Sequence, residues 1–555
     1  MRTKSFVAGA ALLLLAGCLT RDLGPVAPCV QSGVSIVVSQ NAVDKVDVLF
    51  MVDNSNSMAE EQNNLAGNFD TMIRALATGD VTGDGMPEFP PVKDLHVGVV
   101  SSDMGTAGFP VPTCSDDGDP DGDDGVLITR GNTMVAGCSA SYPSFLSFMP
   151  AVDNADNFIQ QFGCVARIGT GGCGFEQQLE SILKAITPAA SPAVAPFVSG
   201  TGHADGRNAG FLRPDSILAL ILVSDEEDCS AQNAEIFNTM SGIFPGEALN
   251  LRCFMYGAES YQAVHPVTRY VNGYLAAVGG DTSRLIFAAI VGVPPDSVPN
   301  PDAVDYDAIL AHPNMQEAID PMDPNRLRTS CNVPGLGIAF PPRRIVEVAR
   351  QIDQATAGPT GVGNATVQSI CQADLRPALR VITNKIGSLL RGACLPRALA
   401  PRADGTVDCT VRETIVGGTC SGAPGAPPCT TPAEKPGCRS DDMGCCLGID
   451  PTNDQPLGQL CTIPQRGVEG AAAGWFYDTT GGDCGGRPCT PTDPGYCAQR
   501  ISFDDAYIPP NRAIVRLECL QAVEGQITCA ADTDCPDPLQ CQAGVCVSVT
   551  CGGAS

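Results

Sequence analysis

Five consecutive residues, Asp53-Asn54-Ser55-Asn56-Ser57, offer one carboxylate and two hydroxyls at alternate positions. They directly follow the apolar run 46–52, which predicts a buried strand. A turn at the end of a strand can aim alternate side chains at one point, and such hard oxygen ligands suit Mg²⁺ or Mn²⁺ rather than zinc. Asp53, Ser55 and Ser57 are therefore candidate metal ligands. The alternative is that Asp53 and Ser55 cap the helix that follows.

The elements needed to position this motif can be found along residues 44–395. Continuous apolar runs predict strands buried on both faces of a parallel sheet, at residues 46–52, 95–101, 217–224, 285–293 and, more briefly, 253–256. Helical spacing of apolar residues predicts helices within residues 62–76, 175–186, 344–352 and 375–390. Strands that alternate with helices indicate an α/β fold with a doubly wound, mostly parallel sheet.

The strand, the Asp-x-Ser-x-Ser turn and the helix together resemble the von Willebrand factor A (vWA) family. The metal-ion-dependent adhesion site (MIDAS) of that family opens with this motif at the end of the first strand. The resemblance covers most of residues 44–395 and implies a Rossmann-like fold. It also implies a Thr from a second loop and an Asp from a third loop.

Asp225 matches the third loop of the family, because it ends the apolar run 217–224. Glu226, Glu227 and Asp228 follow it, and such acidic density is costly without a cation, solvent or a donor. Thr170 is the candidate for the second loop, with Cys173 as the competing position. Residues 168–174 carry Gly and Cys where the family usually has a denser Thr pattern.

The resemblance implies recognition rather than catalysis. The ion would grip an acidic group offered by a partner protein or a surface polymer. The sequence contains no Gly-x-Ser-x-Gly, Walker or His-Glu-x-x-His motif, so we expect no enzyme. Two alternatives stay open: a structural envelope protein, stabilised by disulfides and calcium, without an active adhesion site, and a hydrolase with an unrecognised site.

Two acidic loops, near residues 78–90 and 113–125, are possible insertions that bind Ca²⁺. Acids alternate in the second loop and a Gly stands at its sixth position, as at the opening of a calcium loop: Asp117, Asp119, Asp121, Asp123 and Gly122. The twelfth position is Ile128 rather than Glu, so this is not an EF-hand. Residues 80–85 are a weaker version, and the alternative for both is a solvated acidic loop.

The N-terminus resembles the signal peptide of a bacterial lipoprotein. Arg2 and Lys4 precede a short apolar run, which ends in the lipobox-like sequence Leu15-Ala16-Gly17-Cys18. We expect cleavage after residue 17, lipidation of Cys18 and a tether over residues 18–43. Leu19 favours the outer membrane, on its periplasmic or surface face. The alternative is an ordinary secreted protein.

The chain has 27 cysteines, no Cys-x-x-Cys pair and four histidines, which favours disulfides over zinc sites. Lipidation of Cys18 would leave an even number. A Cys164–Cys173 bridge is one hypothesis. Residues 396–515 form a Cys-rich region of irregular or small-β structure, and the cysteine spacing over 516–555 predicts a small disulfide knot.

The formal net charge of −28 argues against nucleic acid as a partner, because nucleic-acid affinity depends on Lys and Arg releasing counterions. Such a charge instead suits solubility or the capture of divalent cations.

Overall fold

A computed structural model describes residues 45–390, apart from 86–88, 90, 115–121, 215, 247, 334–336 and 358–361. It also describes residues 34–38 and separate stretches between residues 404 and 548. The signal segment, Cys18 and most of the tether lie outside these residues. Within the described part of the chain, no helix has the length and apolar character needed to cross a membrane.

The α/β part is built on a six-stranded sheet, with the order β11-β6-β5-β2-β3-β4. Its strands are β2 (Lys45–Val52), β3 (Asp94–Ser101), β4 (Leu146–Phe148), β5 (Ile217–Ser224), β6 (Leu285–Val291) and β11 (Ala365–Ser369). All neighbouring pairs are parallel except β3 with the edge strand β4. The carboxyl ends of β2 and β5 therefore lie side by side at one edge of the sheet.

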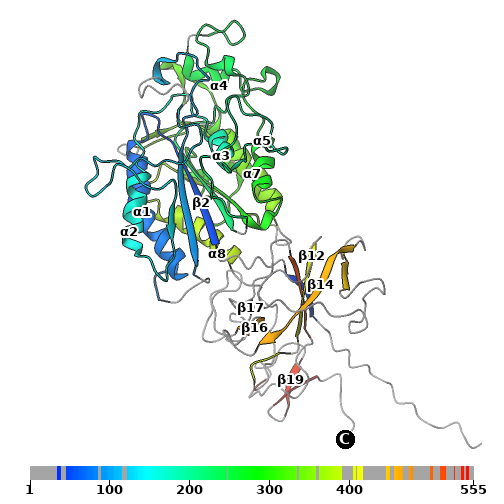
Figure 1. The fold of residues 1–555 in the computed structure, drawn as a ribbon. Coiled ribbons are helices and arrows are strands. Elements are labelled where there is room, and N and C mark those ends of the chain that lie inside the picture. The colour runs from blue at the N-terminus through cyan, green and yellow to red at the C-terminus, as the bar shows by residue number, and fades with distance from the viewer. Residues whose placement is uncertain are drawn as a thin grey trace, which may run out of the picture.

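Helices cover both faces of this sheet (Figure 1). On one face lie α1 (Ala59–Thr78), α2 (Ala155–Val165) and α8 (Arg376–Leu390), which pack against Val46, Val48, Phe50 and Val52 of β2. On the other face lie α3 (Gln178–Ile186), α5 (Thr268–Ala277) and α7 (Arg343–Thr356), which pack with Leu49 and Met51. Alternate β2 residues thus serve two cores, as a strand buried on both faces requires.

Local signals fix the ends of these helices. The helix α1 stops at Gly79, whose φ of 76° is left-handed and whose N–H donates to the carbonyl of Ala75 at 2.8 Å. The helix α2 starts at Asn154, whose side chain accepts a hydrogen bond from the backbone N–H of Asn157. Shorter helices are α4 (Arg252–Met255) and α6 (Tyr306–Ala311).

The predicted strands and helices of the α/β part are largely confirmed, but one run is assigned wrongly, and β4, α2 and α5 are among the elements that the sequence did not predict. The run at residues 253–256 is wrong as a strand, because Arg252–Met255 forms the short helix α4. Its four apolar or aromatic residues fit a buried helical turn as well as a strand, and a run this short cannot decide between them. The sheet instead gains β11, which the sequence analysis did not predict.

Four disulfides lie in the α/β part of the chain that the structure describes: Cys114–Cys173, Cys138–Cys164, Cys229–Cys253 and Cys331–Cys371. The predicted Cys164–Cys173 bridge is wrong, because each of these residues pairs with a partner in the long insertion between β3 and α2. A short sequence separation made the predicted bridge attractive, whereas the fold brings the insertion against the loop before α3.

The C-terminal residues form a second sheet, with the order β1-β18-β12-β14-β13. Its strands are β1 (Val34–Val38), β12 (Cys409–Val416), β13 (Cys446–Ile449), β14 (Pro456–Ile463) and β18 (Ala513–Cys519). The expected tether thus includes a strand, β1, which pairs antiparallel with β18. The expected boundary at residue 516 falls inside β18.

Smaller β elements occur in both parts of the chain. The hairpins β7 (Ile319–Asp320)–β8 (Asp323–Leu327) and β9 (Cys331–Val333)–β10 (Gly337–Ala339) belong to the α/β part. Near the C-terminus lie β15 (Gln465–Arg466), β16 (Trp475–Asp478), β17 (Arg500–Phe503), β19 (Leu539–Gln542) and β20 (Val545–Ser548).

Candidate functional site

The carboxylate of Asp53 is fully buried at the end of β2. Its Oδ1 accepts hydrogen bonds from the backbone N–H of Ser55 at 2.8 Å and from the Ser102 hydroxyl at 3.0 Å. Its Oδ2 accepts from the Ser224 hydroxyl at 2.5 Å. Burial raises the pKa of Asp53, and these three donors oppose the rise. The side chain is thus locked in place at the carboxyl ends of β2, β3 and β5.

Ser55 and Ser57 lie together, with their hydroxyl oxygens 3.3 Å apart. The Ser55 side chain is buried and Ser57 is exposed, so this turn runs from the sheet edge to the surface. The structure gives Asp53 no capping hydrogen bond to α1, whose N-cap residue is Met58 without a side-chain bond. The capping role considered for Asp53 and Ser55 is therefore not the one they play in the structure.

Asp225 comes directly after β5 and is also fully buried. Neither of its carboxylate oxygens makes a hydrogen bond to a described residue. Burial is the largest cause that raises the pKa of Asp225 well above its ordinary value, followed by the charges of Asp53 and Glu226. The nearby Ser57 hydroxyl opposes this rise only in part. A buried carboxylate without a donor is costly, so it calls for a proton or a cation.

The loop over residues 168–174 lies against the Asp53 turn. The Gly172 N–H donates to the Asn54 carbonyl at 2.9 Å, and Gln62 of α1 brackets Gly169 with two hydrogen bonds of 2.8 and 3.2 Å. A Cβ at Gly172 would lie 2.3 Å from the Asn54 side chain. The glycine is therefore required for this close approach.

The two candidates predicted in this loop are Thr170 and Cys173, and their side chains have different surroundings. Thr170 is partly buried and makes no hydrogen bond to a described residue. Cys173 is bonded to Cys114, so its sulfur is not available as a ligand. The loop continues to Glu176, a residue that the sequence analysis did not consider.

Glu176 places a third carboxylate beside Asp53 and Asp225. Its side chain is 5% exposed and makes no hydrogen bond to the side chain of a described residue. Burial raises the pKa of Glu176 well above its ordinary value, and the charges of Glu226, Asp53 and Asp225 add to the rise. The signal that could have found it is its position two residues before α3, all of whose residues are buried.

Two further carboxylates surround this group. Burial raises the pKa of Glu226 to about 7, with a contribution from the charge of Asp53. Glu61, in the first turn of α1, has one buried oxygen without a hydrogen-bond partner, and burial raises its pKa to about 7. None of Glu61, Glu176, Asp225 and Glu226 forms an ion pair with a described Lys, Arg or His. This set is therefore an excess of negative charge that the described chain does not balance.

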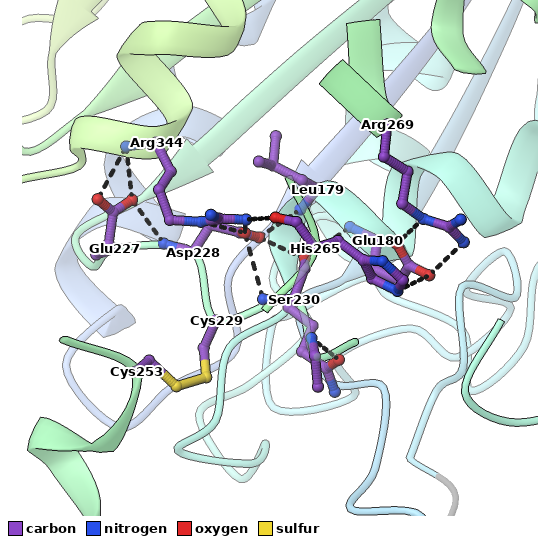
Figure 2. Close-up of polar contacts among 12 residues, drawn as sticks. Leu179, Glu180, Glu227, Asp228, Cys229, Ser230, Cys253, His265, Arg269 and Arg344 are labelled. Carbon is purple, nitrogen blue, oxygen red and sulfur yellow. Dashed lines mark hydrogen bonds and ion pairs between the residues drawn. A yellow bond between two sulfur atoms is a disulfide. The ribbon is translucent and has the colours of Figure 1, made fainter. Parts of the chain in front are cut away.

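The acids that follow Glu226 behave differently (Figure 2). Glu227 accepts the backbone N–H of Arg344 at 2.9 Å, and Asp228 accepts its guanidinium at 3.2 Å. Asp228 also accepts the Ser230 hydroxyl at 2.6 Å and the backbone N–H of Leu179 at 3.0 Å. Asp228 therefore ties the start of α7 to the start of α3 and belongs to the frame of the site.

A cavity of about 350 Å³ opens next to the Asp53 turn. Ser55, Ser57, Glu176 and Glu226 line it on the sheet side. Phe175, Phe254, Phe340, Leu249 and Leu327 contribute apolar wall, and the Cys229–Cys253 disulfide lies at its border. A ligand at this edge of the sheet would thus meet both hydroxyl and carboxylate oxygens and an apolar wall.

The second acidic loop reaches the carboxyl end of β3, where the Asp123 carboxylate accepts the Ser101 hydroxyl at 2.6 Å. Asp117, Asp119 and Asp121 lie outside the described residues. The Asp123 carboxylate pairs with the Arg130 guanidinium at 2.6 and 2.8 Å, so it already has a cationic partner. Asp80 accepts the backbone N–H groups of Gly83 at 2.6 Å and Gly85 at 2.7 Å, which folds residues 80–85 onto its own carboxylate. Both described acids thus have roles within their loops.

The residues at the Asp53 turn offer the kind of oxygen atoms that a divalent ion binds. Asp225 holds two buried oxygens without a donor, next to the hydroxyls of Ser55 and Ser57, and hard divalent cations take such oxygen ligands. Within the described residues, no three His, Cys, Asp or Glu side chains form a ready metal-holding group. The candidate set therefore combines carboxylates with hydroxyls.

No protein-family model and no curated protein matches this chain. Among solved structures, it is similar to the pilus adhesin SpaC from Lactobacillus rhamnosus GG, with a TM-score of 0.27 and 11% sequence identity. The likeness covers 86% of this chain and 39% of that protein. A likeness with so low a TM-score does not indicate a function for this chain.

Proposed function

We propose that the α/β part is a vWA-like domain whose Asp53 turn holds a divalent cation and uses it to bind a partner. Asp225, with its unpartnered buried oxygens, is the observation that carries this proposal. Asp53, Ser55, Ser57 and Asp225 would hold the ion, which would supply an open coordination position for an oxygen of the partner. Mg²⁺ or Mn²⁺ suits these ligands.

The arrangement of the sheet supports this assignment. Open α/β sheets bind ligands at the carboxyl ends of their parallel strands. Here β2 and β5 are adjacent and parallel, and each ends in a buried Asp. In the proposal Thr170 is not required as a direct ligand.

We also propose that the partner is a protein or a surface polymer that offers an acidic group, and that Cys18 carries a lipid that anchors the chain in the cell envelope. The alternative, an envelope protein without an active adhesion site, is favoured by the departure of residues 168–174 from the family pattern. Metal binding distinguishes the two.

The test is a calorimetric titration of the purified mature chain with Mn²⁺ after treatment with a chelator. We expect one site in the wild type and at least tenfold weaker binding in Asp53→Asn and in Asp225→Asn. The matched control is Asp156→Asn, because Asp156 is 75% exposed and pairs with Arg74 of α1. This variant should bind Mn²⁺ as the wild type does.

Thermal unfolding without metal shows whether each variant is folded. A folded Asp225→Asn variant that binds Mn²⁺ with the affinity of the wild type would overturn the proposed site. A wild type that binds no Mn²⁺ and no Mg²⁺ would favour the structural alternative.

A further inference from the structure

The cavity beside the Asp53 turn carries an inference that does not depend on a metal ion. Four glutamates line it, Glu176, Glu226, Glu227 and Glu317, against one basic residue, Arg326. Arg326 already pairs with Asp320 at 3.2 Å. The lining therefore has a strong negative balance within the described residues.

Two of the four glutamates are already compensated. Glu227 accepts the backbone N–H of Arg344, and Glu317 lies 3.8 Å from the guanidinium of Arg343. Glu176 and Glu226 differ, because neither carboxylate forms an ion pair with a described Lys, Arg or His. Glu176 is 5% exposed, and its carboxylate has only its own backbone N–H as a hydrogen-bond donor and forms no ion pair with a described residue. Its carboxylate is thus buried against the cavity with nothing from the chain to neutralise it.

The remaining lining suits an organic cation better than a second metal ion. Three aromatic rings, those of Phe175, Phe254 and Phe340, contribute to the wall, and Phe254 and Phe340 are only partly buried. Aromatic rings attract ammonium and guanidinium groups and also cover the apolar stem of a basic side chain. At about 350 Å³, the cavity is at the lower end of the range for small-ligand sites.

We infer that this cavity receives a basic side chain, a lysine or an arginine of a partner protein, with Glu176 and Glu226 as its counter-charges. The formal net charge of −28 would attract a basic partner segment toward this edge of the sheet. A metal ion at the Asp53 turn would then select a neighbouring acidic group of the same partner. The cavity, however, is expected to bind the basic group with or without that ion.

The probes for the test are the N-acetyl methylamides of lysine and arginine, with the norleucine derivative as the uncharged control. Binding to the mature chain is followed by calorimetry or by ligand-observed NMR, once in a chelator and once with Mg²⁺. We expect at least one basic probe to bind in both conditions, with a dissociation constant in the millimolar range, and the norleucine probe to bind at least tenfold more weakly.

Glu176→Gln and Glu226→Gln should each weaken binding of the basic probe at least fivefold. The matched control is Glu259→Gln, since Glu259 is exposed and does not line the cavity. Both cavity variants remove a charge that has no partner, so their thermal unfolding midpoints should equal or exceed that of the wild type. That measurement separates loss of the site from loss of the fold.

The outcomes also separate this inference from the proposed metal site. If neither basic probe binds better than the norleucine probe while Mn²⁺ binds and Glu176→Gln weakens Mn²⁺, the inference is overturned and Glu176 is a metal ligand. If a basic probe binds as expected and Mn²⁺ does not, the cavity stands and the metal site fails. If neither binds, both are wrong.

Discussion

A buried aspartate lies near each end of strand β2, Asp47 near its start and Asp53 directly after its end. The two carboxylates have different kinds of partners. Asp47, near the start of the strand, accepts the Arg213 backbone N–H at 2.7 Å and its side chain at 2.8 Å, and it also accepts the Ser216 hydroxyl. Asp53, at the other end, has only neutral donors, and Asp225 beside it has only the Ser57 hydroxyl nearby and no hydrogen bond of ordinary geometry.

Burial raises the pKa of Asp47 as well as that of Asp53 and Asp225, but only at Asp47 does a guanidinium oppose the rise. The chain therefore supplies a cation where a buried carboxylate is part of the frame. At the opposite edge it leaves several carboxylates without one. This difference separates a structural acid from an acid that awaits a ligand.

The largest effect is expected from Arg213→Met, which would leave Asp47 buried without its cation. Breaking a buried ion pair from one side costs about 3–5 kcal/mol, so the free energy of unfolding in urea should fall by this amount. The double variant Asp47→Asn with Arg213→Met should recover more than half of the loss. A single variant as stable as the wild type would break the comparison, because Asp47 would then be no better paired than Asp225.

His265 provides a buried base for the same comparison, because it lies 3.7 Å from Glu180 but close to Arg269 and Arg344 (Figure 2). Burial, with the charges of these two arginines, lowers the pKa of His265 to about 3. The folded protein therefore binds this proton less well than the unfolded chain does. The stability due to neutral His265 is complete above about pH 6.5 and is lost as the pH falls toward 3.

The measurement is the free energy of unfolding of the wild type and of His265→Gln at pH 7 and at pH 4. Between these pH values the advantage of the wild type over the variant should shrink by roughly 3 kcal/mol. The groups that face the His265 side chain are Glu180, Arg269 and Arg344. They are present in the wild type and in His265→Gln alike, so their own titration largely cancels when the two proteins are compared. An advantage that stays constant with pH would contradict the prediction.

A smaller effect of opposite sign is expected from Asp225→Asn in the metal-free protein. The amide replaces a buried carboxylate that has no donor, so the free energy of unfolding should rise by about 1–2 kcal/mol. Added Mn²⁺ should then stabilise the wild type, by about 2.7 kcal/mol at a hundred times its dissociation constant, but not the variant. A loss of stability comparable to that of Arg213→Met would show that Asp225 is a structural acid.

The smallest effect is expected from Arg74→Met, which breaks the surface pair with Asp156. The two side chains are 54% and 75% exposed, and such pairs contribute less than about 1 kcal/mol. Urea unfolding of this variant serves as the reference for Arg213→Met. A loss as large as that of Arg213→Met would show that removing an arginine, rather than burying an unpaired acid, accounts for the effect.

Much of the fold could be predicted from the sequence because the strands are continuous apolar runs with no competing pattern. The same clarity located Asp53 and Asp225, since each directly follows such a run. The strand β11 could not be predicted, because three of its five residues, Thr366, Gln368 and Ser369, are polar side chains that the structure nevertheless buries. A polar strand of this kind shows no apolar run, and only its pairing with β6 reveals that it belongs to the sheet, at one edge.

The position of Glu176 at the site and the pairing of the cysteines could not be predicted from the sequence. Thr170 is the candidate for the second loop because it precedes the helix predicted within residues 175–186. Glu176 instead reaches the site because α3 begins beside β5. In the same way, Cys173 pairs with Cys114, 59 residues away, rather than with the nearby Cys164. Contacts of this range depend on how the insertion folds back, which local patterns do not encode.

By itself, the sequence determined where the buried strands run, that an acid follows two of them, and that the chain is strongly acidic. Only the tertiary structure decided which acids have a cation and which do not. The reason is physical: the cost of a buried charge depends on the groups within a few ångströms of it, and at this site those groups come from β2, β3, β5 and the loop before α3.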